Sequence, residues 1–336
     1  MMMSPRSLRC SAFTKRIAIV AAALFVWLPA IASRAAASDT RDALAVLTIG
    51  NSFADDATAF LPEMAKAGGK ELVIFRANLG GASMERHATH LRAFMANADD
   101  PNGRPYKNRL HPQTGERQDF SLPEALEAYA WDVVTIQQVS HLSFRPETFH
   151  PFVDELITAI RRHAPQAEIV IHEIWAYRED HAFFNRDDGF TPRVMYERAS
   201  SAYRALAKEK GMRLLVVGDA FNLARQTRRW TFVPEEVDVS AYEEGELPPQ
   251  DNSLNVGWYW RKGKDGEAPE LRLDAIHANT AGRYLGAAVW YLTLFGEDKV
   301  PDSYAPNGLD ALDAASLRQL AEAAVFAERA YLKRQD

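Results

Sequence analysis

A serine at a junction between a strand and a helix is the first residue that could carry chemistry. In the stretch LTIGNSFADDA, an apolar run ends at Gly50 and is followed by Asn51 and Ser52. A hydroxyl at such a junction projects beyond the sheet, and the N–H groups of the helix start can stabilise an oxyanion. The alternative is that Asn51 or Ser52 only caps the helix. Ser52 is therefore a candidate nucleophile that still needs a base.

A candidate base stands in LDAIHANTAGRYL, where Asp274 and His277 lie three residues apart just before a predicted helix. Histidine is the side chain that most often accepts a serine proton. A carboxylate bound to its other nitrogen fixes the tautomer and stabilises the imidazolium. We expect a turn to place Asp274 against His277. The pair alone is ambiguous, because Asp and His are common near helix starts.

The elements that must position these residues follow an alternating pattern. Short apolar runs divided by amphipathic helical patterns predict an α/β fold, a three-layer sandwich in which helices cover both faces of a parallel sheet. Ligands of such sheets bind beyond the carboxyl ends of the strands. Polar clusters follow four of the runs, so we expect them to converge. They are Asn51-Ser52, Gly80-Gly81, Gln137-Gln138 and His172-Glu173.

Residues 38–336 are expected to form one domain with two insertions, near 97–120 and 229–272. Both segments are too long for ordinary connections, so we expect loops or small hairpins beside a site. The second carries Trp258, Tyr259 and Trp260, with Trp230 upstream. These rings could stack on sugars, or they could pack within a hairpin of their own.

The N-terminus has the layout of a secretory signal peptide, residues 1–37. Four basic residues precede the apolar run IAIVAAALFVWLPAIA, and small residues follow it. Cleavage is expected after Ala30-Ile31-Ala32 or after Ala35-Ala36-Ala37. The mature protein would be secreted or periplasmic, with no stable membrane insertion once the leader is removed.

Loss of this leader changes the bulk chemistry. The only cysteine, Cys10, is lost with it, which leaves no disulfide and no thiol nucleophile. A cut after Ala32 removes four basic residues and changes the formal charge from −6 to −10. An acidic chain argues against sequence-blind nucleic-acid binding, which needs a basic surface.

The blocks together resemble the SGNH (GDSL-like) hydrolases. The resemblance rests on IGNS after the first strand, a glycine after the second, an amide after the third and DAIH before a late helix. It spans the chain from Gly50 to His277 and implies a flavodoxin-like sheet of about five strands. It also implies that Ser52 is the nucleophile, His277 the base and Asp274 the acid that orients it. A second glycine as in G-x-S-x-G is missing, which separates the serine block from the α/β-hydrolase elbow.

The resemblance further implies an oxyanion hole. Its donors would be the N–H groups of Ser52 and Gly81, or Gly80, and a side-chain amide. The chain departs from the usual Gly-x-Asn-Asp block, because it has TIQQVSH there. Gln137 is then the expected amide donor and Gln138 the alternative, as in the branch that resembles sialate and carbohydrate O-acetylesterases.

Four further residues are expected to bind substrate: Asn51, Gln138, His172 and Trp175. A core role is the alternative for His172 and Trp175. No metal site is expected, because His172 and Glu173 are adjacent strand residues that point to opposite faces. His87 and His90 could ligate together on a helix, but a solvated helix face is the preferred interpretation.

The expectation is thus an exported serine esterase without a cofactor that hydrolyses O-acyl esters, O-acetyl above all, of a small molecule or glycan. A lipase or thioesterase on the same scaffold is one alternative. A non-catalytic glycan-binding protein of the SGNH fold is the other, although decayed sites usually lose at least one of the three catalytic residues.

Overall fold

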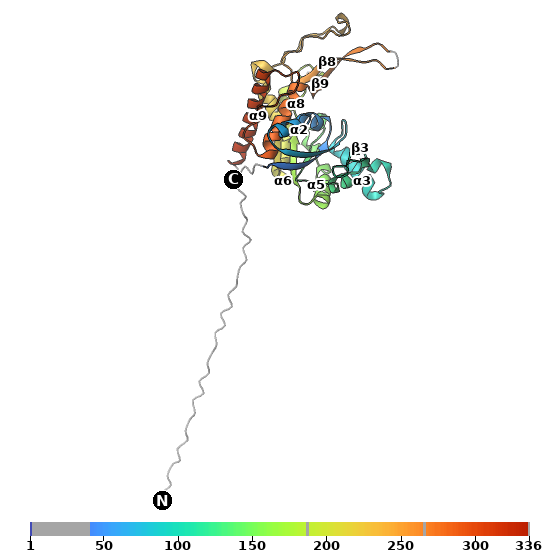
Figure 1. Cartoon of the computed structure of the whole chain (residues 1–336), viewed down its shortest axis with the longest axis vertical. Coiled ribbons are helices and arrows are strands. Elements are labelled where there is room, and N and C mark those ends of the chain that lie inside the picture. Colours follow the sequence, from blue (N-terminus) through green and yellow to red (C-terminus); the bar gives the residue numbers. More distant parts are fainter. Residues whose placement is uncertain (2–40, 186–187, 265–266, 335–336) are drawn as a thin grey trace. The chain divides into compact units, whose positions relative to one another are not determined.

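Five parallel strands in the order β2-β1-β5-β6-β7 form the central sheet (Figure 1). The computed structural model describes residues 1, 41–185, 188–264 and 267–334. This strand order is the flavodoxin-like arrangement of doubly wound α/β folds, so the predicted fold class is confirmed. The strands are β1 Ala43–Gly50, β2 Glu71–Asn78, β5 Val133–Ile136, β6 Glu168–Glu173 and β7 Arg213–Val216.

Helices lie on both sides of this sheet. Figure 1 shows α3, α5 and α6 on one side and α2, α8 and α9 on the other. The central strands are accordingly mostly apolar, and Val46, Leu47 and Val134 are fully buried. The helices are α1 Ser52–Ala57, α2 Leu61–Ala67, α3 Met84–Ala96, α4 Leu122–Glu127, α5 Phe152–His163, α6 Pro192–Lys210, α7 Val217–Arg225, α8 Thr280–Phe295 and α9 Ala311–Leu332.

Local signals set several of the helix ends. The side chains of Asn51 and Ser83 accept N–H bonds at the starts of α1 and α3, and Gly211 ends α6 in the left-handed conformation. Residues 52–67 form two helices, α1 and α2, separated by a turn at 58–60.

The carboxyl ends of the strands meet at one edge of the sheet. Gly50 pairs with Asn78, Ile49 with Ile136, and Ile136 with Ile171. The loops that follow β1, β2, β5 and β6 therefore begin side by side. All four polar clusters start at this edge, as the parallel topology requires.

Each of the two predicted insertions contains a two-stranded hairpin. The first holds β3 Tyr106–Leu110 and β4 Arg117–Phe120, and the second holds β8 Asn255–Arg261 and the start of β9 Glu270–Ala278. Strand β9 runs beyond the expected insertion to residue 278. Asp274 and His277 therefore lie in a strand, and the predicted position in a turn before the helix is wrong.

The predicted signal peptide and both cleavage sites lie outside the described residues, apart from Met1. In the part of the chain that the structure describes, no helix combines the length and apolar character needed to cross a bilayer.

Candidate active site

Ser52 is the first residue of α1, directly after the cap Asn51 and the end of β1. The absence of a side chain at Gly50 makes this turn possible, because a Cβ there would lie 2.6 Å from Oε1 of Gln137. In the GNS sequence, Gly50 thus allows Gln137 to approach closely, Asn51 caps α1, and Ser52 places a hydroxyl at the edge of the sheet.

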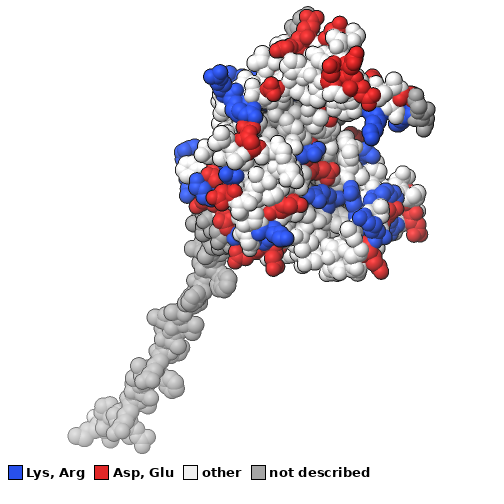
Figure 2. Space-filling view, turned by 45° about the horizontal axis from the view of Figure 1, so that its top comes forward, with Lys and Arg blue, Asp and Glu red and all other residues white. Residues whose placement is uncertain are grey.

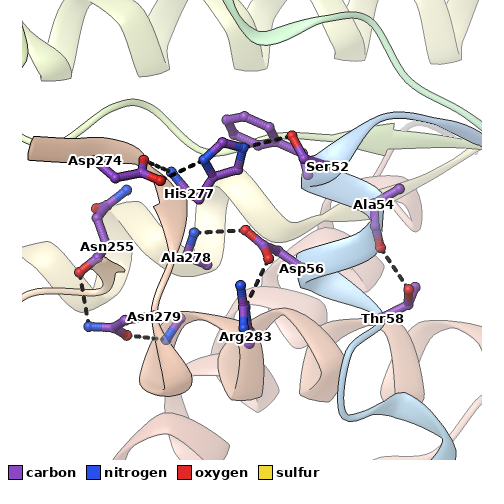
Figure 3. Close-up of polar contacts among 12 residues, drawn as sticks. Ser52, Ala54, Asp56, Thr58, Asn255, Asp274, His277, Ala278, Asn279 and Arg283 are labelled. Carbon is purple, nitrogen blue, oxygen red and sulfur yellow. Dashed lines mark hydrogen bonds and ion pairs between the residues drawn. The ribbon is translucent and has the colours of Figure 1, made fainter. Parts of the chain in front are cut away.

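Ser52, His277 and Asp274 form one hydrogen-bonded line (Figure 3). Ser52 Oγ lies 2.8 Å from Nε2 of His277, and Nδ1 of His277 lies 2.8 Å from Oδ2 of Asp274. The serine and histidine are 225 residues apart in sequence. The side chains of His277 and Asp274 are 36% and 23% exposed, so the line is open to solvent on one side.

A bulge in β9 allows the acid and the histidine to meet. Residues three apart on a regular strand point to opposite faces. Here Gly257 pairs with Asp274 and Asn255 with Ala278, so β9 carries extra residues opposite β8. Oδ1 of Asp274 accepts the N–H groups of Ile276 and His277 at 3.1 and 2.9 Å, which fixes the bulge.

The electrostatics favour a charged Asp274 and a basic His277. Burial alone would raise the pKa of Asp274, but its bonds to the side chain and backbone of His277 outweigh this and lower the pKa to about 2. The bond to Asp274 raises the pKa of His277 above its ordinary value, against the opposing effect of burial. Asp274 can therefore hold the ring with its unprotonated Nε2 directed at Ser52 and stabilise an imidazolium.

Asp56 links the serine helix to the histidine strand, a role that no sequence pattern indicated. Its Oδ2 accepts the Ala278 N–H at 2.9 Å, and its Oδ1 accepts Nε of Arg283 at 2.8 Å (Figure 3). Burial is the largest influence on Asp56 and raises its pKa, although Arg283 and the Ala278 N–H oppose it. One carboxylate thus connects α1, β9 and α8.

Gln137 and Asn51 are buried beneath the serine, each 1% exposed. Gln137 Nε2 donates to Asn51 Oδ1 at 2.9 Å, and Gln137 Oε1 accepts Nδ1 of His172 at 3.1 Å. Asn51 also donates to the Ala82 carbonyl at 3.0 Å. We predicted that Gln137 donates to the oxyanion and that Asn51 contacts the substrate. Both predictions are corrected, because these buried side chains bond to each other and to the protein and stabilise the turn after β1.

Gln138 is fully buried and is likewise structural. Its Oε1 accepts the N–H of Met84 at the start of α3, and its Nε2 donates to the Thr148 carbonyl. It holds α3 against the segment after β5. The expectation that Gln138 binds substrate, or replaces Gln137 as oxyanion donor, is not met.

His172 and Trp175 are core residues, 0% and 1% exposed, so the prediction that they bind substrate is wrong. Trp175 nevertheless supports the site. Its ring packs on that of Phe53, with 4.3 Å between the ring centroids, and its N–H donates to the Ile276 carbonyl in the β9 bulge. Burial lowers the pKa of His172 to about 3, which keeps this ring neutral.

Backbone N–H groups remain as oxyanion donors. Ser52 is the first helical residue, so its N–H has no acceptor within the helix. The N–H groups of Ser52, Gly80 and Gly81 have no hydrogen-bond acceptor among the described residues. Gly81 is exposed and has a φ of 63°, which only glycine adopts readily.

The other candidates from the sequence are structural. His87 is fully buried, so the solvated-face interpretation is wrong for it; its Nε2 donates to the Gly50 carbonyl at 2.9 Å. His90 bonds to the Asn102 carbonyl instead of sharing a ligand with His87. Trp230 is buried, with its N–H on Ser316, whereas Tyr259 is exposed. Within the described residues, no group of three His, Cys, Asp or Glu side chains is placed to hold a metal.

Chemically, this arrangement can move a proton from a hydroxyl to an imidazole and stabilise the resulting charge. The base is within hydrogen-bonding reach of the hydroxyl, the acid is within reach of the base, and free N–H groups lie at the same sheet edge.

Several solved structures are similar to this chain. A crystal structure of a DUF4886 family protein from Bacteroides uniformis is 24% identical, with a TM-score of 0.63 over 85% of this chain and 95% of that one. A putative GDSL-like lipase from Parabacteroides merdae is 14% identical, with a TM-score of 0.42 over 76% of this chain and 97% of that one. Phospholipase A1 from Streptomyces albidoflavus is 13% identical, with a TM-score of 0.35 over 75% and 98%.

No curated protein matches the sequence. The family model that does match is described as a domain of unknown function, DUF4886, and covers residues 45–227. This match includes Ser52 and the loops that follow β1, β2, β5 and β6, and it ends before Asp274 and His277. The chain belongs to the DUF4886 family.

Proposed function

We propose that this protein is an SGNH-type serine hydrolase that cleaves carboxylic esters through an acyl-enzyme. The observation that carries the proposal is the Ser52–His277–Asp274 line, with two successive contacts of 2.8 Å. Such a line is the minimum needed to activate a serine near neutral pH. Its position at the carboxyl edge of a doubly wound sheet is where such folds bind ligands.

In this mechanism Ser52 Oγ attacks the ester carbonyl carbon while its proton passes to Nε2 of His277. The tetrahedral oxyanion accepts hydrogen bonds from the backbone N–H groups of Ser52 and Gly81. The intermediate collapses, the C–O bond to the alcohol breaks, and His277 returns the proton to the departing alcohol. Water, deprotonated by His277, then attacks the acyl-enzyme and releases the acid and Ser52.

For the substrate we propose a small acyl group, acetyl above all, on a carbohydrate hydroxyl, and an exported site of action. The predicted export leader and the aromatic hairpin support this choice. Trp258 and Trp260 are half-buried on β8 and Tyr259 is exposed, so the rings are accessible for stacking. The glutamine block does not support a carbohydrate substrate, because the Gln137 side chain is bonded to Asn51 and His172 inside the protein.

A panel of esters tests the proposal. We expect acetate release from acetylated oligosaccharides, and a kcat/KM for 4-nitrophenyl esters that falls as the acyl chain lengthens. The Ser52→Ala variant should lose activity by about 10⁶-fold, the loss typical when a serine nucleophile is removed. Preference for long acyl chains would favour the lipase alternative, and no hydrolysis of any ester would favour the non-catalytic one.

A further inference from the structure

Two arginines contact the end of β2 and the loop after it, which supplies the proposed Gly81 donor. Nη1 of Arg86 donates to the Gly80 carbonyl at 3.2 Å, and Nη2 of Arg109 donates to the Asn78 carbonyl at 3.0 Å. The Gly80 carbonyl belongs to the same peptide group as the Gly81 N–H. The two guanidinium groups thus flank the loop on which the ester oxygen would be held.

Neither guanidinium is neutralised by the protein. Among the described residues, Arg86 and Arg109 form no ion pair, whereas Lys107, two residues before Arg109, pairs with Asp119 at 3.0 Å. Nε of Arg109 is buried and has no hydrogen-bond partner. The guanidinium of Arg109 thus keeps hydrogen-bonding capacity that the described residues do not use.

The nearby acid Asp55 acts on a different arginine. Asp55 accepts Nδ2 of Asn78 at 2.8 Å. Burial lowers the pKa of Arg76, the charge of Asp55 opposes this effect, and Arg109 adds to it. Arg76 is also held by Thr58. Among the described residues, Asp55 forms no ion pair with Arg86 or Arg109, so neither guanidinium is bound by this carboxylate.

Other basic side chains lie near this loop. Figure 2 shows Lys and Arg side chains on the face below the β8–β9 hairpin, with Asp and Glu side chains among them. A guanidinium without an ion pair on such a face can attract an anion to the sheet edge.

We propose that Arg86 and Arg109 form a subsite for an anionic group of the ester substrate, such as a carboxylate, phosphate or sulfate. A guanidinium matches these groups through paired N–H donors. The inference rests on the proposed esterase function and narrows its substrate to acidic esters. The anion belongs either to the alcohol part or to the acyl part.

Matched pairs of esters distinguish these two sources. For the alcohol part, 4-carboxyphenyl acetate is compared with 4-carbamoylphenyl acetate. For the acyl part, the mono-4-nitrophenyl ester of succinic acid is compared with 4-nitrophenyl butanoate. We expect the wild type to favour the carboxylate in one pair by about tenfold in kcat/KM, which is typical of a charged hydrogen bond, and the preference to decrease with added salt.

The variants Arg86→Gln and Arg109→Gln should each abolish this preference. Lys107→Gln is the matched control, because it removes the same charge from β3 but from a residue already paired with Asp119; its carboxylate preference should stay within about twofold of wild type. Equal rates within both pairs in the wild type, or an unchanged preference in Arg109→Gln, would overturn the subsite.

A binding measurement separates failure of the subsite from failure of the esterase proposal. Both pairs of esters are titrated calorimetrically into Ser52→Ala, with and without Arg109→Gln. Tighter binding of the carboxylate in either pair that is lost with Arg109→Gln supports the subsite even if no ester is hydrolysed. Equal binding within both pairs excludes it.

Discussion

At the residue scale, the proposed chemistry depends on the charge of one imidazole. His277 can accept the Ser52 proton only while Nε2 is unprotonated. Asp274 raises the pKa of His277, and Asp56 adds to this effect while Arg283 opposes it. A more basic imidazole accepts the proton more readily, but it is also protonated at a higher pH.

The pH dependence of the wild type follows from this balance. We expect kcat/KM for an acetyl ester to fall as the pH is lowered through a midpoint above 6.5, the ordinary pKa of histidine, because protonation blocks His277. Asp274→Asn should move the midpoint to lower pH and reduce the rate on the order of 10⁴-fold. Profiles of kcat/KM against pH, recorded by stopped-flow or steady-state kinetics, measure the midpoint and the rate. A midpoint that stays in place in Asp274→Asn would exclude the proposed role of this carboxylate.

At the element scale, the site depends on the positions of α1 and β9. The serine belongs to a helix of six residues, α1, and the histidine to a bulge in β9. Asp56 joins the two through the Ala278 N–H and is held in turn by Arg283 of α8. Because Asp56 lies one helical turn after Ser52, it fixes the distance between the two elements without contacting a substrate.

The Asp56→Asn variant tests this positioning role. We expect the free energy of unfolding to fall by about 1–3 kcal/mol, since a buried hydrogen bond to a charged group is weakened. We also expect kcat to fall by roughly tenfold with a smaller change in KM, and the pH midpoint of His277 to move down. Denaturant unfolding and steady-state kinetics measure these effects.

Glu63→Gln is the control, because this exposed carboxylate on α2 makes no such link. It should match the wild type in all three measurements. A loss of stability in Asp56→Asn without any change in kcat or in the pH midpoint would reduce Asp56 to a purely structural residue.

At the scale of the whole molecule, the sequence predicted the sheet and the convergence of its polar loops. Continuous apolar runs divided by helices have few alternatives to a parallel sheet. The meeting of Ser52 with His277 was predicted from the resemblance, and no local pattern required it. The β9 bulge was missed, because strand pairing between β8 and β9 depends on partners distant from DAIH.

The buried braces could not be predicted either. Gln137, Gln138 and His172 are polar side chains at strand ends, which is also the signature of a binding site. Their partners come from other strands and loops: Asn51 for Gln137, Met84 and Thr148 for Gln138. A single sequence does not show that the amide groups of Gln137 and Gln138 will bond to other parts of the protein. In the sequence, residues that support the site therefore resemble residues that bind its substrate.

The reactivity of one hydroxyl tests the central claim most directly. A fluorophosphonate probe should label the protein at Ser52, as located by peptide mass spectrometry, because only an activated serine attacks phosphorus at a useful rate. Labelling should disappear in Ser52→Ala and fall strongly in His277→Ala, while Ser83→Ala, which alters only the α3 cap, should label like the wild type. Labelling that persists in Ser52→Ala, or a folded wild type that is never labelled, would contradict the account.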